Sequence, residues 1–195
     1  HGADATICIG GDGTVLYANH KGRIDGAILG IGSDKSYICQ LHKDAWRGRI
    51  EALLGSWKTS KIMALECTIG DKKFDALNDI VVHATHYRVA EMSVSIEAGN
   101  RKQETRFEGD GMIISTPLGS AAYAFSAGGE KMPPKERKLI VVPICPYKRA
   151  FSPQVLPEEG NVSITVGSDC ALIIDGVFVR RLRKGEIVVA RKGGS

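Results

Sequence analysis

The sequence predicts two domains, an N-terminal α/β domain with an incomplete parallel sheet and an all-β C-terminal domain of the sandwich type. Three observations support this fold class. Apolar runs alternate with helical patterns in the first part of the 195-residue chain, short strands separated by turn residues fill the rest, and the pattern changes near residues 56–60. We therefore expect one domain over residues 1–58 and another over residues 59–195, with the extreme C-terminus a candidate to pack back on the first.

The N-terminal domain is predicted to start with a strand over residues 6–9, an apolar run that ends in glycines. Such a run is typical of a parallel strand buried on both faces. Residues 26–31 form a second apolar run, and between residues 44 and 54 apolar side chains recur at helical spacing up to Gly55. Strand, helix, strand, helix is the order of a parallel α/β sheet.

The start of the chain lies within this pattern. The first residue is His1 rather than methionine, and residues 4–9 already resemble the end of a central strand. Open α/β sheets rarely begin this way. We therefore expect that strand–helix units precede this segment, so that the sequence is N-terminally truncated.

Alternating apolar and polar residues mark the C-terminal domain. Residues 92–97 read Met-Ser-Val-Ser-Ile-Glu, the period-two pattern of a strand buried on one face. Turn pairs such as Gly99-Asn100 and Asp175-Gly176 separate several such segments, which favours a β-sandwich. Further strands are predicted near residues 61–69, 78–83, 111–115, 138–144, 162–166, 170–174, 177–182 and 186–190.

Composition narrows the possible partners. The net charge of +4 is compatible with an anionic ligand, but no cluster of basic and aromatic residues accompanies it, so no nucleic-acid partner is expected. No apolar run is long enough to span a bilayer, and no membrane partner is expected. The five cysteines lie far apart without metal-ligand spacing, which indicates buried thiols in a reducing cytoplasm.

The strongest local signal is the loop Gly10-Gly11-Asp12-Gly13-Thr14, between a predicted strand and a predicted helix. Glycines let main-chain N–H groups approach phosphate oxygens at a helix N-terminus. A carboxylate at Asp12 would repel those phosphates, so it suggests action on a hydroxyl group or on a magnesium ion beside them. A simple Gly-Asp-Gly turn is the alternative interpretation.

A second signal covers residues 109–129, where a strand runs through a Pro–Gly turn into a short helix. Its many small residues permit close backbone approach to a flat ligand, and its serines and threonine supply uncharged hydroxyl groups. A tightly packed strand–helix corner would look similar.

Taken together, these motifs resemble the NAD kinase family. The GGDGT loop, Asn78-Asp79, residues 109–129, residues 143–146 and Asp175-Gly176 occur in the order found in that family. Residues 115–129 are the most specific mark, because lipid kinases and 6-phosphofructokinases share GGDGT. The resemblance implies an N-terminal domain for the phosphate donor, a β-sandwich domain for NAD, and an active site between them.

The implied enzyme is a phosphotransferase. It would transfer the γ-phosphoryl group of ATP, or a phosphoryl group of polyphosphate, to the adenosine ribose 2′-hydroxyl of NAD, giving NADP. Mg²⁺ is expected to arrive with the nucleotide, without an assigned protein ligand. NAD and ATP are the expected partners, and a homodimer or homotetramer in the cytoplasm is the expected assembly.

Site residues carry over position by position. Asp12 matches the catalytic aspartate that accepts the proton of the ribose hydroxyl, and the rest of its loop matches the donor-phosphate site. The expected phosphate-binding residues are Gly10, Gly11, Gly13 and Thr14, and the expected NAD-binding residues are Asn78, Asp79, Asp110, Ala122, Tyr123 and Ser126.

The sequence departs from the family pattern in several places, which affects the expected ligand contacts. Ala121 replaces a threonine that can hydrogen-bond NAD, and Leu118 replaces a small hydroxyl residue. Gly32 replaces an asparagine, and Tyr147 and Ser152 replace a histidine and an arginine.

Two other functions stay open. A lipid kinase of the diacylglycerol or sphingosine type shares GGDGT and a β-sandwich, but residues 115–129 are foreign to it and no lipid-sized apolar stretch is present. A non-catalytic, NAD-binding regulatory protein would agree with the departures.

Overall fold

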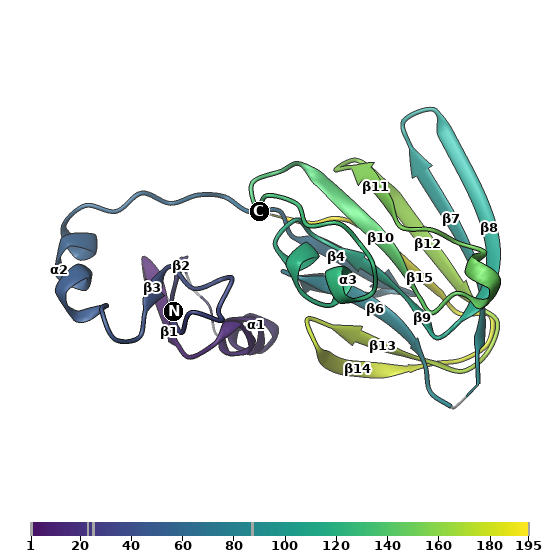
Figure 1. Cartoon of the computed structure of the whole chain (residues 1–195), viewed down its shortest axis with the longest axis horizontal. Helices are drawn as coiled ribbons and strands as arrows, with labels where there is room; N and C mark the ends of the chain where they lie inside the picture. The colour runs from purple at the N-terminus through teal and green to yellow at the C-terminus, as the bar shows by residue number, and fades with distance from the viewer. Residues whose placement is uncertain (1, 23, 25, 87, 195) are drawn as a thin grey trace. The chain divides into compact units, whose positions relative to one another are not determined.

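The computed structural model describes residues 2–22, 24, 26–86 and 88–194 (Figure 1). The chain divides into two compact units, unit 1 over His1–Lys61 and unit 2 over Ile62–Ser195. The prediction placed the boundary near residues 56–60.

Unit 1 is built on a parallel sheet in the order β1-β2-β3. The pairing of β1 with β2 runs in register from Ala5 opposite Ala27 to Ile9 opposite Ile31. The predicted parallel α/β pattern is confirmed, and β3 is a short strand that the sequence pattern did not reveal. The elements are β1 (Ala5–Ile9), α1 (Asp12–His20), β2 (Ala27–Gly32), β3 (Leu41–His42) and α2 (Arg47–Gly55).

The expected burial of the first strand on both faces is wrong. Cys8 is buried, whereas Ile7 is 43% exposed and Ile9 is 66% exposed. The physical reason is position, because β1 lies at an edge of the three-stranded sheet, and α1 is the helix that contacts β1 and β2.

Unit 2 is a sandwich of two six-stranded sheets, as predicted. One sheet has the order β11-β10-β9-β6-β13-β14 and the other β5-β4-β15-β12-β7-β8 (Figure 1). The strands of the first sheet are β6 (Asp79–Ala84), β9 (Gly111–Ser115), β10 (Lys138–Ile144), β11 (Gln154–Pro157), β13 (Cys170–Ile174) and β14 (Val177–Leu182). Those of the second are β4 (Leu65–Ile69), β5 (Lys72–Ala76), β7 (Ala90–Ala98), β8 (Arg101–Gly109), β12 (Asn161–Val166) and β15 (Ile187–Lys192).

One apolar core lies between the two sheets. The alternating segment in β7 behaves as predicted, because Met92, Val94 and Ile96 are buried in this core. They meet side chains of the facing sheet such as Ile114 and Leu172. Burial of one face of each sheet is the main stabilising contribution in such a sandwich.

In unit 2, the strands β5, β8 and β11 escaped the sequence analysis. Each occupies the edge of its sheet. Edge strands are often charged, because a polar row of side chains discourages pairing with other chains. In β8 most side chains are exposed, so the sequence lacks the apolar alternation that reveals a strand.

A second, smaller core covers the outer face of the sheet that contains β6, β9 and β10. It forms where the 3₁₀ turn η1 (Gly119–Ala121) and the short helix α3 (Tyr123–Ser126) pack on these strands. Val81, Ile113 and Ala124 meet there. The central strands are therefore buried on both faces, and the polar ends of these strands carry the candidate site.

The C-terminal strand β15 lies inside the second sheet, between β12 and β4. No helix in the described ranges is long and apolar enough to cross a bilayer.

Candidate functional site

The loop predicted to bind phosphate joins β1 to α1 within unit 1. Gly10 has φ +152°, and its N–H donates a hydrogen bond to the carbonyl oxygen of Ile31 at 2.9 Å. A Cβ atom at this position would collide with the side chain of Thr14. Because α1 begins at Asp12, the loop lies at a helix N-terminus, where free N–H groups attract anions.

The Asp12 carboxylate is tied to a distant segment of the same unit. Its Oδ2 accepts a hydrogen bond from the N–H of Tyr37 at 2.7 Å, and its Oδ1 accepts one from the N–H of Ile38 at 2.9 Å. Each carboxylate oxygen has a further lone pair, so both remain able to accept a ligand hydroxyl. The side chain is only partly buried, which keeps it accessible.

Gly32 illustrates how a departure from the family pattern changes this loop. A Cβ atom there would lie 2.8 Å from the carbonyl oxygen of Gly10 and 2.7 Å from Sγ of Cys39. The asparagine that the resemblance predicts would not fit this conformation. Cys39 instead approaches the loop, with its Sγ 3.5 Å from the Gly10 carbonyl oxygen.

The Asn78-Asp79 pair lies in unit 2, where β6 begins. Both residues are buried, with 7% of Asn78 and 5% of Asp79 exposed. The buried carboxylate of Asp175, in the turn between β13 and β14, accepts hydrogen bonds from the N–H groups of Leu77, Asn78 and Asp79 at 2.9, 2.7 and 3.1 Å.

The environment changes the proton affinity of Asp79. Burial, and then the negative charge of Asp175, raise the pKa of Asp79 to about 7. The ordinary value is 3.8, so this carboxyl group changes charge near neutral pH rather than in acid. Perturbed carboxyl groups of this kind are frequent in binding and catalytic sites.

Asn78 has an unusual side-chain oxygen. Oδ1 is inaccessible and has no hydrogen-bond partner within the described part of the chain. Burying an amide oxygen without a donor costs free energy on the order of 1–3 kcal/mol. A hydroxyl or amino group of a ligand could supply the missing donor once the side chains that cover Oδ1 move aside.

The hydroxyl groups predicted to contact a flat ligand serve the protein instead, which corrects the interpretation of residues 109–129. Ser115 Oγ donates to the Asn78 carbonyl oxygen at 2.9 Å, and Thr116 Oγ1 donates to that of Leu77 at 2.6 Å. Ser120 Oγ donates to Pro117 and accepts from the N–H of Met132 at 2.8 Å. All three are fully buried. Ser115 and Thr116 fasten the corner to Leu77 and Asn78, and Ser120 ties it to Met132.

Close packing explains the small residues of this corner. A Cβ atom at Gly119 would lie 2.3 Å from the Asn78 carbonyl oxygen. The backbone of η1 therefore touches the backbone of Asn78. Leu118 is buried beside it, and Ala121 is partly buried.

The structure brings three of the predicted NAD-binding residues together. Tyr123 is 41% exposed, and partial burial raises its pKa. Negative charge at Cys145, Asp110 and Asp79 adds to this effect, which means that these groups lie near the phenol. Of the remaining three predicted residues, Asn78 precedes Asp79 in the chain, and Ala122 and Ser126 are exposed at the start and end of α3.

Sequence reasoning missed two residues of this neighbourhood. Asp175 was noted as a turn residue and, with Gly176, as one of the motifs in the family order, and Cys145 as part of another motif. Neither was predicted as a site residue. Cys145 has φ +45°, which is rare outside glycine, and its exposed thiol lies close enough to Tyr123 to contribute to the raised pKa of the phenol. Tertiary contacts reveal both residues. For Asp175, the sequence offers one signal, an Asp-Gly turn that directly follows the apolar strand β13.

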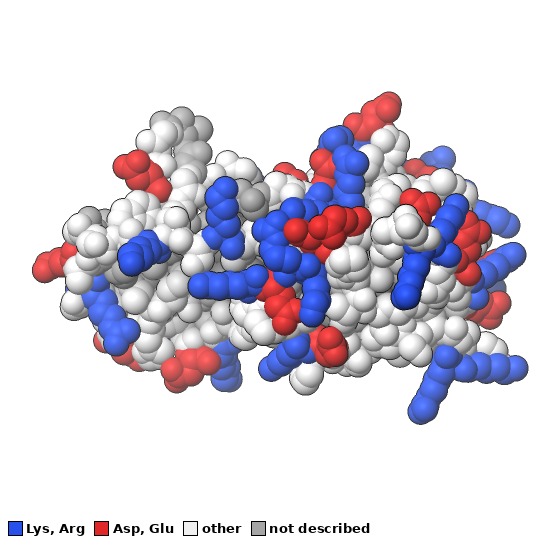
Figure 2. Space-filling view, turned by 90° about the horizontal axis from the view of Figure 1, so that it is seen from above, with Lys and Arg blue, Asp and Glu red and all other residues white. Residues whose placement is uncertain are grey.

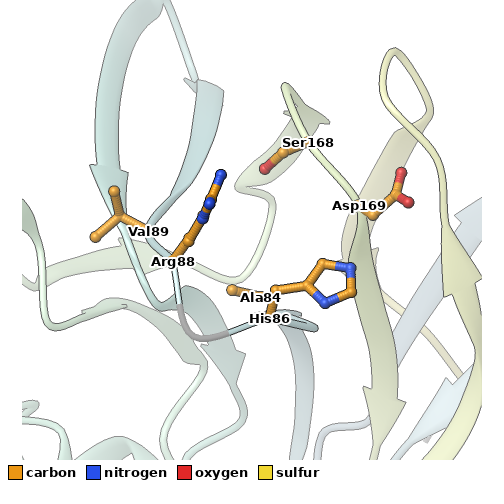
Figure 3. A pocket seen from close by; sticks show the side chains of 6 residues that line it. All are labelled: Ala84, His86, Arg88, Val89, Ser168 and Asp169. Carbon is orange, nitrogen blue, oxygen red and sulfur yellow. The ribbon is translucent and has the colours of Figure 1, made fainter.

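A hollow of about 510 Å³ lies elsewhere on unit 2, around the far end of β6 (Figure 3). Ala84, His86, Arg88, Ser168 and Asp169 line it, and none of them is a predicted site residue. Among the described residues no group of three or more His, Cys, Asp or Glu side chains could hold a metal ion.

The charged side chains of unit 2 are of mixed sign on the face seen in Figure 2. Glu66 pairs with Arg191, and Glu158 pairs with Lys192 and Arg137. This face lacks the continuous basic stripe typical of nucleic-acid-binding proteins.

The sequence profile described as "ATP-NAD kinase C-terminal domain" matches residues 77–195. A protein of Clostridium perfringens named NAD kinase is 36% identical over 206 aligned positions, which cover 97% of this chain and 71% of that protein.

Two solved structures have the same fold. Yeast NADH kinase complexed with NADH has a TM-score of 0.85 at 25% identity, covering 98% of this chain and 59% of its own. An NAD kinase from Archaeoglobus fulgidus in complex with ATP has a TM-score of 0.83 at 23% identity, covering 96% of this chain and 73% of its own. This chain therefore spans less than two thirds of the yeast chain.

Proposed function

Because this chain belongs to the NAD kinase family, we propose that it binds NAD and transfers the γ-phosphoryl group of ATP to the 2′-hydroxyl of the adenosine ribose, giving NADP. The resemblance inferred from the motifs is confirmed, and so is the phosphotransferase class. The relatives lend no support to the lipid-kinase alternative or to a non-catalytic protein.

The observation that carries the proposal is the buried Asn78-Asp79 pair. An unpartnered amide oxygen beside a carboxyl group is suited to ribose hydroxyls, which donate hydrogen bonds and also accept them. The pair falls within the part of the chain that matches the family profile. Tyr123 and Asp110 belong to the same neighbourhood, and Ala122 and Ser126 complete the proposed NAD contacts.

In unit 1, we assign the donor phosphates to the loop of Gly10, Gly11, Gly13 and Thr14. The N–H of Gly10 already bonds Ile31, so the N–H groups of Gly11 and Gly13 are the proposed phosphate donors. These groups lie at the N-terminus of α1, where the helix dipole favours negative charge. Asp12 is the proposed base. It accepts the proton of the 2′-hydroxyl as the oxygen attacks the γ-phosphorus, and the N–H groups of Tyr37 and Ile38 hold the carboxylate in one orientation.

The described side chains do not form a protein cage for a metal ion. Mg²⁺ is assigned to the nucleotide, on whose phosphates it would offset negative charge.

The proposal also covers the phosphoryl donor, the acceptor and the assembly. ATP is the preferred donor, with polyphosphate as the second, since a related structure contains ATP. Reduced NAD is a possible second acceptor, since the yeast relative is described with NADH. A homodimer or homotetramer in the cytoplasm is proposed, and the five free cysteines agree with a reducing compartment.

The test measures formation of NADP from NAD in the presence of Mg²⁺, with ATP as the donor in one assay and polyphosphate in a parallel assay. Replacing Asp12→Asn keeps the shape but removes the base, so we expect the rate to fall roughly 10²–10⁴-fold. Asp4→Asn, an exposed position just before β1, is the matched control and should keep the wild-type rate.

Near-full activity of Asp12→Asn would show that Asp12 is not the base. NAD binding without turnover of the wild type with either donor would favour the regulatory protein. Activity on diacylglycerol in vesicles, without NAD binding, would favour the lipid kinase.

A further inference from the structure

The Asp175 carboxylate holds three consecutive N–H groups that are almost one hundred positions away in the sequence. Oδ2 accepts from Leu77, and Oδ1 accepts from Asn78 and from Asp79. In return, the N–H of Asp175 donates to the carbonyl oxygen of Asp79 at 3.0 Å. This cluster of four hydrogen bonds is the Asp175 clamp.

The clamp bonds the main chain just beyond the point where the pairing of β6 with β13 ends. The pairing of β6 with β13 runs from Ala84 opposite Cys170 to Ile80 opposite Ile174 and then stops at the turn. Beyond that point, main-chain partners from β13 end, and a side chain takes over. Asp175 itself has φ +50°, a conformation that only a tight turn explains.

A carboxylate suits this task better than other side chains. Three N–H donors need at least three lone pairs on two oxygens, whereas an asparagine side chain has one oxygen and would turn an NH₂ group toward one donor. Hydrogen bonds to a buried carboxylate are also stronger than those between neutral groups.

The residues that the clamp holds are those with unsatisfied or perturbed side chains. Asn78 carries the unpartnered Oδ1, and Asp79 carries the carboxyl group that burial and Asp175 affect. On the opposite side of the same backbone, Ser115 and Thr116 hold the Asn78 carbonyl oxygen. The main chain of the pair is therefore fixed from two sides, and its side chains are left for another partner.

We propose that Asp175 is a positioning residue of the NAD site, which fixes the Asn78-Asp79 backbone so that both side chains present their oxygens to the ribose hydroxyls. This rests on the proposed function, because it takes NAD as the ligand. Asp175 acts through the pair and does not itself touch NAD.

The electrostatic consequence is a pH dependence of NAD binding. Ribose hydroxyls donate to an ionised carboxylate, so binding favours loss of the Asp79 proton and tightens as the pH rises through about 7, the native pKa of Asp79. Asp175 faces Asp79 from the β13–β14 turn, and Tyr123 approaches from α3, with Asp110 and Cys145 beside the phenol. Removing the charge of Asp175 lowers the pKa of Asp79.

The experiment compares wild type with Asp175→Asn, Asp79→Asn and the control Asp71→Asn, which changes an exposed carboxylate in the β4–β5 turn. Calorimetry measures NAD and ATP dissociation constants between pH 5.5 and 8.5. Carbon-13 NMR follows the titration of Asp79, which is identified by its disappearance in Asp79→Asn. Thermal unfolding monitors folding of each variant.

We expect Asp175→Asn to weaken NAD binding roughly 10–100-fold at pH 8, because one hydrogen bond and the alignment of the pair are lost. ATP binding should not change. The midpoint of the remaining pH dependence, and the NMR titration of Asp79, should both move to lower pH. In Asp79→Asn the pH dependence should disappear, and Asp71→Asn should match the wild type.

Wild-type NAD affinity in Asp175→Asn, or an unchanged titration of Asp79, would overturn the proposal. Equal losses of NAD and ATP binding together with a lower melting temperature would reduce Asp175 to a structural turn residue. If the wild type binds no NAD, the proposed function fails, and with it the NAD-positioning role, whereas the NMR titration still decides whether Asp175 controls Asp79.

Discussion

Units 1 and 2 use the same device in two different settings. In unit 1 the Asp12 carboxylate accepts the N–H groups of Tyr37 and Ile38, and in unit 2 the Asp175 carboxylate accepts those of Leu77, Asn78 and Asp79. Asp12 begins a helix on a small sheet and is partly exposed, whereas Asp175 is 6% exposed at the end of a sandwich. The comparison teaches that burial decides what an aspartate in such a turn can do. The partly exposed Asp12 carboxylate can still accept further hydrogen bonds from solvent or a ligand, whereas the buried Asp175 carboxylate bonds three main-chain N–H groups.

The largest effect on stability should come from Asp79. Its pKa is raised, so between pH 4 and pH 7 the native state holds a proton that the unfolded state has lost, and the free energy of unfolding falls as the pH rises. The difference between 3.8 and about 7 corresponds to about 4 kcal/mol.

Asp79→Asn removes this dependence. At pH 8 the variant should be more stable than the wild type, and near pH 4 the two should be similar. Urea denaturation followed by circular dichroism, which reports mainly the strands of unit 2, checks this at several pH values. A wild-type-to-variant difference that does not vary with pH would contradict it.

The next largest effect tests the comparison between the Asp175 and Asp12 carboxylates directly. Asp175→Ala leaves three N–H groups without a partner, two of them on buried residues, and should lower the free energy of unfolding of unit 2 by roughly 3 kcal/mol. Asp12→Ala exposes its two N–H groups to water and should cost about 1 kcal/mol in unit 1.

The two units can be followed separately. Both tryptophans of the chain, Trp46 and Trp57, lie in unit 1, so fluorescence reports that unit and circular dichroism reports mainly the sandwich. Equal losses in the two variants would show that burial does not distinguish the two carboxylates.

The smallest effects concern the glycines of the loop in unit 1. Gly10→Ala forces an unfavourable φ and a collision with Thr14, and should destabilise unit 1 by about 2 kcal/mol. Gly13→Ala meets no atom within 4 Å and lies inside α1, so it should stabilise that helix by about 0.5–1 kcal/mol. Tryptophan fluorescence during urea denaturation measures both, and a destabilised Gly13→Ala would refute the distinction.

Much of the fold could be predicted because it depends on local patterns. Alternation in β7 requires a strand with one buried face, and the glycine loop after an apolar run requires a strand–helix turn. The edge strands β5 and β8 escaped, since their charged side chains carry no apolar period. The burial of Ile7 and Ile9 was misjudged, because an apolar run indicates what a strand can bury and not what covers it.

For the candidate site, the sequence by itself identified the candidate segments, because motif and order single out the GGDGT loop, the Asn78-Asp79 pair and residues 109–129. Tertiary structure decided how they are used. It turned Ser115, Thr116 and Ser120 into supports, left Asn78 Oδ1 without a partner, and raised the pKa of Asp79 through burial and Asp175. The physical reason is range: turns and periodicity arise from neighbours along the chain, whereas desolvation and hydrogen-bond partnership between residues 79 and 175 exist only after β6 and β13 pair.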